Sequence, residues 1–242
     1  MPEQVEVWSA AATLPPGLDA TALAALLAED ERARLAGFRF DADATAYLLA
    51  HALRRLVLAR RLGCTPAELV FRTGPRGAVA LDHPQAQGLQ ASLSRSRAGV
   101  AVALADAAVG VDLEAVEASR ADFELLAPWL RWEAGPPTRG PAEFFRHWTA
   151  LEAFWKAMGV GLAQDNPPLR CETAGEDILL RFATGEDALA GRARQLDAGP
   201  GAALAVATRG AAPPRVVHHR IADARGWQRL QRAPAGAADL PP

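Results

Sequence analysis

The run from Asp43 to Leu62 constrains the fold more than any other stretch of the chain. It contains neither proline nor glycine, it is rich in residues with good helix propensity, and its apolar residues form a dense face. A helix of this kind has to bury that face, and Gly63 follows it as a residue suited to a helix C-terminus. The rest of the chain must therefore supply a surface that covers it.

Short strands are expected on both sides of this helix. Apolar or alternating runs predict strands at 5–9, 69–72, 78–81, within 92–116, and at 178–182, 204–207 and 216–221. Further helices are expected at 19–35, with Asp19 or Thr21 as the cap, and at 123–132 and 143–158. This mixture predicts an α+β fold, of an α/β sandwich-like kind.

A weak internal repeat indicates two related halves. The segment GVAVALAD at 99–106 resembles GAALAVATRG at 201–210, and each follows a glycine turn. We therefore expect an N-terminal α/β subdomain at 1–110, a C-terminal α/β subdomain at 111–232, and a flexible tail at 233–242, which is poor in large apolar residues.

Composition excludes several classes of protein. The chain has 242 residues, half of them hydrophobic, and a formal net charge of −2, which argues against a general binder of nucleic acid or membrane surfaces. Cys64 and Cys171 have no metal-type spacing and indicate no disulfide framework. The N-terminus has no basic segment followed by an apolar run, and no apolar stretch is long enough to span a membrane. We expect a cytoplasmic location.

The first set of residues that could carry chemistry is Gly110-Val111-Asp112-Leu113-Glu114, at the end of an apolar strand. Residues two apart in a strand share a face, so Asp112 and Glu114 lie side by side. Two neighbouring carboxylates either lie at a strand end in open solvent or share a cation. Oxygen ligands of this kind suit Mg²⁺.

The second set lies on the helix predicted at 143–158. An apolar stripe with helical spacing has to face the core, and it consists of Phe144, Trp148, Leu151, Trp155 and Met158. Beside this stripe, Thr149, Glu152 and Lys156 are spaced by three and four residues, where the rim of a cleft would be. The alternative is an ordinary Glu–Lys surface pair, which contributes roughly 0.2–0.5 kcal/mol.

Lys156 is the only lysine, whereas the other 25 basic residues are arginine. Nucleotide composition can replace lysine by arginine across a chain, and one lysine can survive by chance. The alternative is that this position needs a compact ammonium rather than a planar guanidinium.

Taken together, GVDLE and WTALEAFWKAMGVGL resemble the paired signature of the 4′-phosphopantetheinyl transferase superfamily, with a spacing of 40 from Asp112 to Glu152. Phe38, the arginine-bearing helix, the turn Gly74-Pro75-Arg76-Gly77 and Ser94-Arg95-Ser96 extend the resemblance to the longer single-chain, surfactin-synthetase-priming subfamily. The resemblance covers roughly residues 30–165.

This resemblance implies a pseudo-dimer of two similar subdomains with small antiparallel sheets, with coenzyme A in the cleft between them. It also implies a monomeric enzyme that transfers the 4′-phosphopantetheine of coenzyme A to a serine of an apo acyl or peptidyl carrier protein and releases 3′,5′-ADP. Asp112, Glu114 and Glu152 would hold Mg²⁺, and Lys156 would contact the phosphate. Glu152 or a water on the metal would take the serine proton.

The departures from the family pattern all concern anion binding. Arginine replaces the usual histidine at Arg95, and the usual basic residues are absent at Ala78 and Ala46. Residues that could bind the coenzyme instead are Ser94, Arg95, Arg76, Arg72, Arg34 and Arg39. A degenerate relative that binds a carrier or nucleotide without transfer, and a plain Mg²⁺-dependent phosphohydrolase, are the alternatives.

Overall fold

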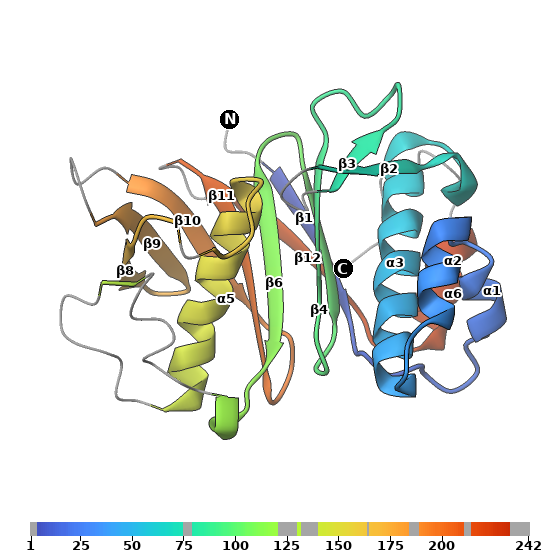
Figure 1. Ribbon diagram of the computed structural model, residues 1–242, viewed down its shortest axis with the longest axis horizontal. Coiled ribbons are helices and arrows are strands. Elements are labelled where there is room, and N and C mark those ends of the chain that lie inside the picture. The colour runs from blue at the N-terminus through green and yellow to red at the C-terminus, as the bar shows by residue number, and fades with distance from the viewer. Residues whose placement is uncertain are drawn as a thin grey trace.

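The structure is a computed structural model, and it describes residues 4–74, 79–120, 130–131, 140–163, 165–183, 189–210 and 214–232. The described residues form a mixed α+β fold, as the sequence predicts, with three sheets and two long helices that lie on opposite sides of the molecule (Figure 1). The arginine at 76, Ala78, most of the helix predicted at 123–132, and the tail at 233–242 lie outside the described residues.

The first sheet has four strands in the order β12-β1-β5-β4. Its strands are β1 (Gln4–Ala10), β4 (Gln90–Arg95), β5 (Val100–Ala105) and β12 (Arg215–Ile221). Strand β1 pairs in parallel with β12 and antiparallel with β5. A sheet that begins in the N-terminal half is therefore completed by a strand from near the other end of the chain.

The long helix α3 (Asp41–Leu62) covers one face of this sheet. Gly63 ends the helix with φ at +70°, in the left-handed region that glycine occupies without a Cβ penalty. The same core receives α1 (Ala20–Ala24), α2 (Glu29–Ala36) and α6 (Ala224–Arg232), with Trp227 and Leu230 buried. The helix predicted over 43–62 is confirmed as α3.

The second sheet has six strands in the order β6-β11-β10-β9-β8-β7. They are β6 (Val109–Ala115), β7 (Leu130–Arg131), β8 (Leu169–Ala174), β9 (Asp177–Phe182), β10 (Leu189–Leu196) and β11 (Ala202–Arg209). Helix α5 (Pro141–Ala157) packs across it, in contact with β6, β10 and β11. Leu130 and Arg131 are in a strand, so the helix predicted over 123–132 is wrong at these two residues.

A third apolar cluster joins the two sheets. It consists of Val5, Val7, Ala101, Ala103, Ala105, Val109, Val111, Leu113, Leu204 and Val206. The other faces of the same strands contribute to the clusters under α3 and under α5. The layers therefore run from α3 through the first sheet and the second sheet to α5, and the strands β1, β5, β6 and β11 are largely buried on both faces.

Strands β4 and β6 lie next to each other where the two sheets meet (Figure 1). Each is the edge strand of its own sheet, and serine side chains connect them. Ser92 Oγ accepts a hydrogen bond from Val111 N at 3.0 Å, and Ser94 Oγ accepts one from Leu113 N at 3.1 Å. These bonds satisfy two backbone donors that an edge strand would otherwise leave without a strand partner.

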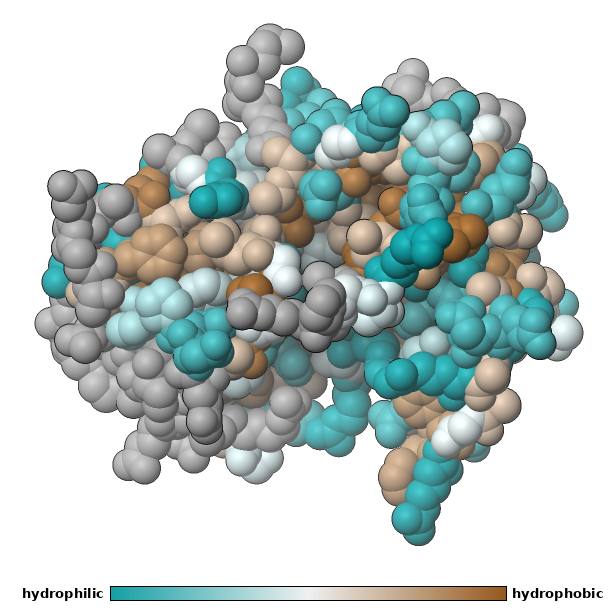
Figure 2. All heavy atoms as spheres, turned by 45° about the horizontal axis from the view of Figure 1, so that its top comes forward, coloured by the Kyte–Doolittle hydropathy of each residue, from teal (hydrophilic) through white to brown (hydrophobic). Residues whose placement is uncertain are grey.

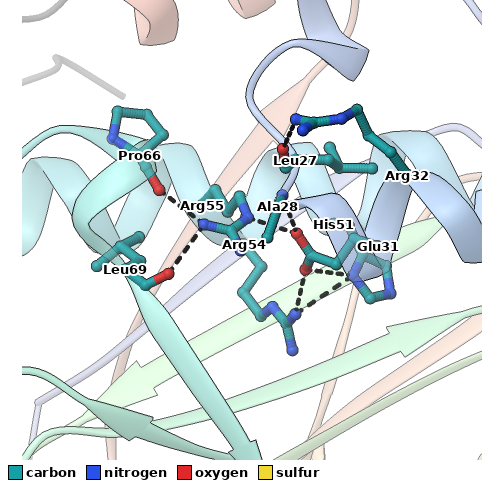
Figure 3. A network of polar contacts seen from close by, with 9 residues as sticks. All are labelled: Leu27, Ala28, Glu31, Arg32, His51, Arg54, Arg55, Pro66 and Leu69. Carbon is teal, nitrogen blue, oxygen red and sulfur yellow. Dashed lines mark hydrogen bonds and ion pairs between the residues drawn. The ribbon is translucent and has the colours of Figure 1, made fainter.

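A buried polar network fixes α2 against α3 (Figure 3). Glu31 Oε1 accepts hydrogen bonds from Arg54 Nη2 at 2.7 Å and lies 2.8 Å from His51 Nδ1, while Oε2 accepts from Arg55 Nε at 2.6 Å. Arg55 Nη1 also donates to the carbonyls of Pro66 at 2.7 Å and Leu69 at 3.1 Å. The carboxylate therefore anchors two buried guanidinium groups in an otherwise apolar core.

No helix among the described residues is long and apolar enough to cross a membrane. Figure 2 shows hydrophobic residues on one face as separate patches between hydrophilic ones. The two-stranded sheet of β2 (Val70–Thr73) and β3 (Val79–Asp82) carries two of the exposed large hydrophobic residues, Val70 and Val79.

The predicted division at residue 110 stays a prediction. The structure places 214–232 with the N-terminal sheet rather than with the sheet of α5, through β12 and α6. A structural relation between the two halves likewise stays a prediction. Each half does place one long helix on a sheet, and the two repeat segments become β5 and β11, which are both inner strands.

Candidate active site

The site is built on β6, the edge strand that faces both β4 and helix α5. Gly110 contacts the helix backbone directly, because a Cβ on this residue would lie 1.8 Å from the carbonyl oxygen of Ala153. Val111 and Leu113 point into the cluster between the sheets. Asp112 and Glu114 alternate with them and lie on the side of α5. The glycine therefore lets the helix approach the strand that carries the carboxylates.

Asp112 is 4 % exposed and receives two hydrogen bonds on the same oxygen. Lys156 Nζ donates to Asp112 Oδ1 at 2.6 Å and to the carbonyl of Val111 at 3.2 Å. Ser94 Oγ donates to Asp112 Oδ1 at 2.9 Å. The other oxygen, Oδ2, is buried and accepts no hydrogen bond from the described residues. One half of the carboxylate is thus held by the protein.

Glu152 lies one helical turn before Lys156 on α5 and is partly buried. Burial, which has the largest effect, and the negative charges of Asp112 and Glu114 together raise the pKa of Glu152 to about 7, against the opposing effect of Lys156. The three carboxylates are therefore close enough to repel one another. The sequence-predicted residues Asp112, Glu114, Glu152 and Lys156 come together from β6 and α5.

The donor atoms and the charge of these side chains suit a hard divalent cation. The donor set is all oxygen, it carries more negative charge than Lys156 balances, and Oδ2 of Asp112 is buried without a hydrogen bond. Within the described ranges, no three His, Cys, Asp or Glu side chains are grouped closely enough to hold a metal ion. Coordination of one ion by all three carboxylates stays a prediction.

The apolar stripe predicted on α5 is only partly buried. Phe144, Leu151 and Trp155 are buried, whereas Trp148 and Met158 are not fully covered. The helix face against β6 instead uses small residues, because the backbone of Ala153 and Ala157 meets Gly110. Thr149 is fully buried, and its hydroxyl donates to the carbonyl of Phe145 at 2.9 Å, so it does not line a rim.

Two of the residues predicted to bind the coenzyme lie around Tyr47. The guanidinium of Arg95 lies 5.6 Å from the centre of the Tyr47 ring and 5.5 Å from that of Phe38. Burial raises the pKa of the Tyr47 hydroxyl, as does Glu31, while Arg34 acts in the opposite direction. Arg34 and Arg95 therefore both lie near this ring. Their roles stay predictions.

The other four candidates have different surroundings. Arg72 is exposed, and its Nε donates to Asp82 Oδ2 at 2.7 Å. Arg39 is exposed and lies 5.5 Å from the centre of the Phe40 ring. Arg76 lies outside the described residues. Ser94 is buried, and its hydroxyl is already used by Asp112 and by Leu113 N.

Sequence analysis missed Ser92 and the Glu31 network. Serines at 92, 94 and 96 alternate, so they share one face of a strand, and this pattern was the available signal for Ser92. For the network, the signal was the pair Arg54-Arg55 in the middle of an apolar helix. Both residues have to be buried there, and buried arginines need an acidic partner.

A pocket of about 470 Å³ opens beside β6, but on the other face of the strand. It is lined by Leu113, Ala115, Arg97, Glu117 and Arg220 among others. Asp112 and Glu114 are absent from its lining, which agrees with the alternation of side chains along a strand. This pocket is therefore distinct from the carboxylates.

Comparison with known proteins agrees with this geometry. Residues 108–207 match the family model described as the 4′-phosphopantetheinyl transferase superfamily. The matched segment contains β6, α5 and β11, and so includes Asp112, Glu114, Glu152 and Lys156.

Three curated relatives match longer stretches. The 4′-phosphopantetheinyl transferase HetI of Nostoc sp. is 31 % identical over 152 residues, which is 59 % of this chain and 63 % of the relative. A putative 4′-phosphopantetheinyl transferase of Synechocystis sp. is 27 % identical over 66 % of this chain and 67 % of its own length. The 4′-phosphopantetheinyl transferase psf-1 of Bacillus pumilus is 29 % identical over 55 % and 58 %.

The chain thus spans about three fifths to two thirds of the length of these relatives. The family match and the residues gathered between β6 and α5 point to the same part of the chain. Residues 108–207 thus match the 4′-phosphopantetheinyl transferase superfamily, and the chain is similar to curated 4′-phosphopantetheinyl transferases.

Proposed function

We propose that this protein is a Mg²⁺-dependent transferase that moves the 4′-phosphopantetheine group of coenzyme A to a serine hydroxyl of an apo acyl or peptidyl carrier protein. The observation that carries the proposal is the hydrogen bond from Lys156 to Asp112, beside Glu152, within the segment that matches the family. The names of the curated relatives support the class of reaction.

In the proposed reaction, the serine oxygen of the carrier forms a bond to the phosphorus that bears the pantetheine. The bond from that phosphorus to the bridging oxygen breaks, and 3′,5′-ADP leaves with the electron pair. Transfers of this kind are catalysed mainly by positioning and by neutralising charge on the phosphate oxygens.

We assign roles to the protein's own residues as follows. Asp112, Glu114 and Glu152 would hold Mg²⁺, which when bound supplies positive charge to the pyrophosphate. Lys156, whose Nζ lies 2.6 Å from Asp112 Oδ1, would contact the same phosphates. Glu152, beside Asp112 and Glu114, is the residue that we propose to accept the proton of the serine.

For coenzyme A itself, we propose Arg95 and Arg34 near Tyr47 as contacts to its phosphates, with Arg39 and Arg76 as further cations. The carrier, a monomeric state and a cytoplasmic location are part of the same proposal. So is membership of the longer single-chain subfamily, which is supported by residues 30–165.

The test is to mix the chain with Mg²⁺, coenzyme A and a panel of apo carrier domains, and to weigh the carriers. A mass gain of one phosphopantetheine on at least one carrier is expected, and it should disappear in Asp112→Ala and Glu152→Ala variants that remain folded. No gain on any carrier would contradict the proposal.

Two other results would identify the alternatives. Release of 3′,5′-ADP from coenzyme A without a carrier would indicate a phosphohydrolase. Absence of coenzyme A binding in calorimetry, together with binding of an apo carrier, would indicate a relative that has lost transfer.

A further inference from the structure

The boundary between the two sheets contains a side chain that the family-matched segment does not include. Ser94 lies on β4, before the start of the match at residue 108, yet its hydroxyl reaches Asp112 on β6. Both side chains are almost completely buried, at 5 % and 4 % exposure. The contact therefore joins the N-terminal sheet to the carboxylate through a protected hydrogen bond.

The hydroxyl of Ser94 is used in both directions. It accepts a hydrogen bond from Leu113 N at 3.1 Å and donates its one proton to Asp112 Oδ1 at 2.9 Å. A serine hydroxyl has one donor, so this bond occupies it fully. The backbone bond fixes where Oγ lies, and the fixed Oγ in turn fixes the carboxylate.

The contacts of Asp112 are unequal on its two oxygens. Oδ1 accepts hydrogen bonds from Ser94 Oγ on β4 and from Lys156 Nζ on α5. Oδ2 is buried without a hydrogen bond from the described residues. Two donors on one oxygen stop rotation of the carboxylate about its Cβ–Cγ bond. A ligand held in this way keeps the other oxygen in a constant position, as outer-shell partners do in metal sites.

We propose that Ser94 is a positioning residue, which orients Asp112 from across the boundary between the sheets and leaves Oδ2 for the divalent cation. This inference rests on the proposed function of the carboxylates as metal ligands. It changes the role first expected for Ser94, from a contact to coenzyme A to a support for Asp112. It also makes the metal site depend on both halves of the chain.

The chain contains a matched control. Ser92 lies two residues earlier on the same strand, and its Oγ accepts from Val111 N at 3.0 Å in the same manner. Among the described residues, the hydrogen bond that links the Ser92 hydroxyl to β6 is this one to a backbone amide, and no carboxylate takes part in it. Replacing Ser92 removes a comparable link between the sheets without removing a hydrogen bond to Asp112.

The test compares Mn²⁺ binding, followed by electron paramagnetic resonance with and without coenzyme A, in the full-length wild type, Ser94→Ala, Ser92→Ala and Ser94→Thr. Ser94→Ala should weaken Mn²⁺ binding by about 10- to 100-fold. Ser92→Ala should bind Mn²⁺ nearly as the wild type does. Ser94→Thr restores a hydroxyl and should recover most of the affinity.

Equal Mn²⁺ affinities in Ser94→Ala and Ser92→Ala would overturn the proposal, as would failure of threonine to rescue. Urea unfolding of each variant separates loss of metal binding from loss of folding. If Ser94→Ala does not fold, Ser94→Cys keeps the volume with a much weaker hydrogen bond and replaces it in the comparison.

Carrier loading by the wild type is measured in parallel. Loading with unchanged Mn²⁺ affinity in Ser94→Ala would refute the role of Ser94 and leave the proposed function intact. No loading, with weaker Mn²⁺ binding in Ser94→Ala alone, would refute the proposed function and support the role of Ser94. A wild type that binds no Mn²⁺ overturns both.

Discussion

The ammonium of Lys156 lies between two oxygens of one strand, Asp112 Oδ1 and the carbonyl of Val111, and its side chain is 28 % exposed. A compact ammonium can meet both oxygens and still turn a donor toward a substrate. A guanidinium is larger and planar, and its donors point in fixed directions. The space beside β6 therefore favours lysine for a reason that composition does not supply.

Lys156→Arg should therefore lower the rate of carrier loading by at least about tenfold although the charge is kept. Single-turnover loading at saturating coenzyme A measures this rate, and Lys156→Met shows the effect of removing the charge as well. Near wild-type turnover in Lys156→Arg would mean that the single lysine reflects nucleotide composition only.

The charge of a second residue, Glu31, affects the stability of the fold. Burial by itself raises the pKa of Glu31, but hydrogen bonds from His51, Ala28 N and Arg55 outweigh it and hold the pKa far below the ordinary value of 4.5. A carboxyl whose pKa is lower in the folded state binds fewer protons there than in the unfolded state. Its contribution to stability is complete above pH 4.5 and is lost as the pH falls below that value.

Glu31→Gln should thus reduce the free energy of unfolding at neutral pH by about 3–5 kcal/mol, because two buried guanidinium groups lose their counter-charge. The variant should also lose less stability than the wild type between pH 4.5 and roughly pH 2. Urea unfolding across this range measures both effects. Glu29→Gln, an exposed residue on the same helix, is the control, and an equal loss in both variants would contradict the network's role.

Among the secondary-structure elements, the contact of α5 with β6 determines the geometry of the site. The helix carries Glu152 and Lys156, the strand carries Asp112, and Gly110 lets their backbones touch. A methyl group at Gly110 would overlap the Ala153 carbonyl, so the helix would have to move away from the strand. The distance from Lys156 to Asp112 would then increase.

Gly110→Ala is accordingly expected to cost about 3 kcal/mol of stability, and to lower transfer activity in whatever fraction stays folded. Gly37→Ala is the comparison, because Gly37 is exposed, has a negative φ and has only ordinary contacts around its missing Cβ, so its effect should stay within about 0.5 kcal/mol. Thermal unfolding of the pair measures the difference. Equal stabilities would show that α5 can adjust its position freely.

Some helices and strands could be predicted from sequence patterns alone. The strong helix patterns gave α3 and α5 to within two residues, since long periodic stretches leave little choice. The helix predicted over 19–35 is instead two helices, because Ala28 is extended and its N–H donates to Glu31 Oε2 at 2.9 Å. Arg54 and Arg55 hold that carboxylate in place, so contacts distant in sequence override local helix propensity.

Other elements have too weak a hydrophobic periodicity to be predicted from the sequence. Strands β8 and β10 contain several charged or polar residues, and α6 follows a strand with no marked stop signal. In the site, the paired motifs located Asp112, Glu152 and Lys156, because their spacing is local to one strand and one helix. Ser94 reaches Asp112 only through the packing of two sheets, which no spacing in the sequence encodes.

For the whole molecule, the apolar cluster between the sheets means that neither half is complete by itself. Val109, Val111 and Leu113 of β6 and Leu204 and Val206 of β11 face residues of β1 and β5. The family-matched segment 108–207 carries the carboxylates and the lysine, but its apolar inner face is covered by the other sheet.

A chain of residues 108–207 alone should therefore aggregate, or form a loosely packed state that binds a hydrophobic dye, whereas the full chain unfolds cooperatively. Circular dichroism, dye binding and size-exclusion chromatography on both would measure this. A monomeric fragment with a cooperative unfolding transition would contradict the dependence of one half on the other.

The parallel pairing of β1 with β12 brings Gln4 beside Arg215. During synthesis on the ribosome, β1 emerges before the other elements described here, but its outer neighbour β12 follows only after about two hundred further residues. Until then, one edge of β1 has unpaired amides and carbonyls, and the core under α3 lacks Trp227 and Leu230. Pairings this distant in sequence close slowly, so the half of the protein that is made first finishes folding last.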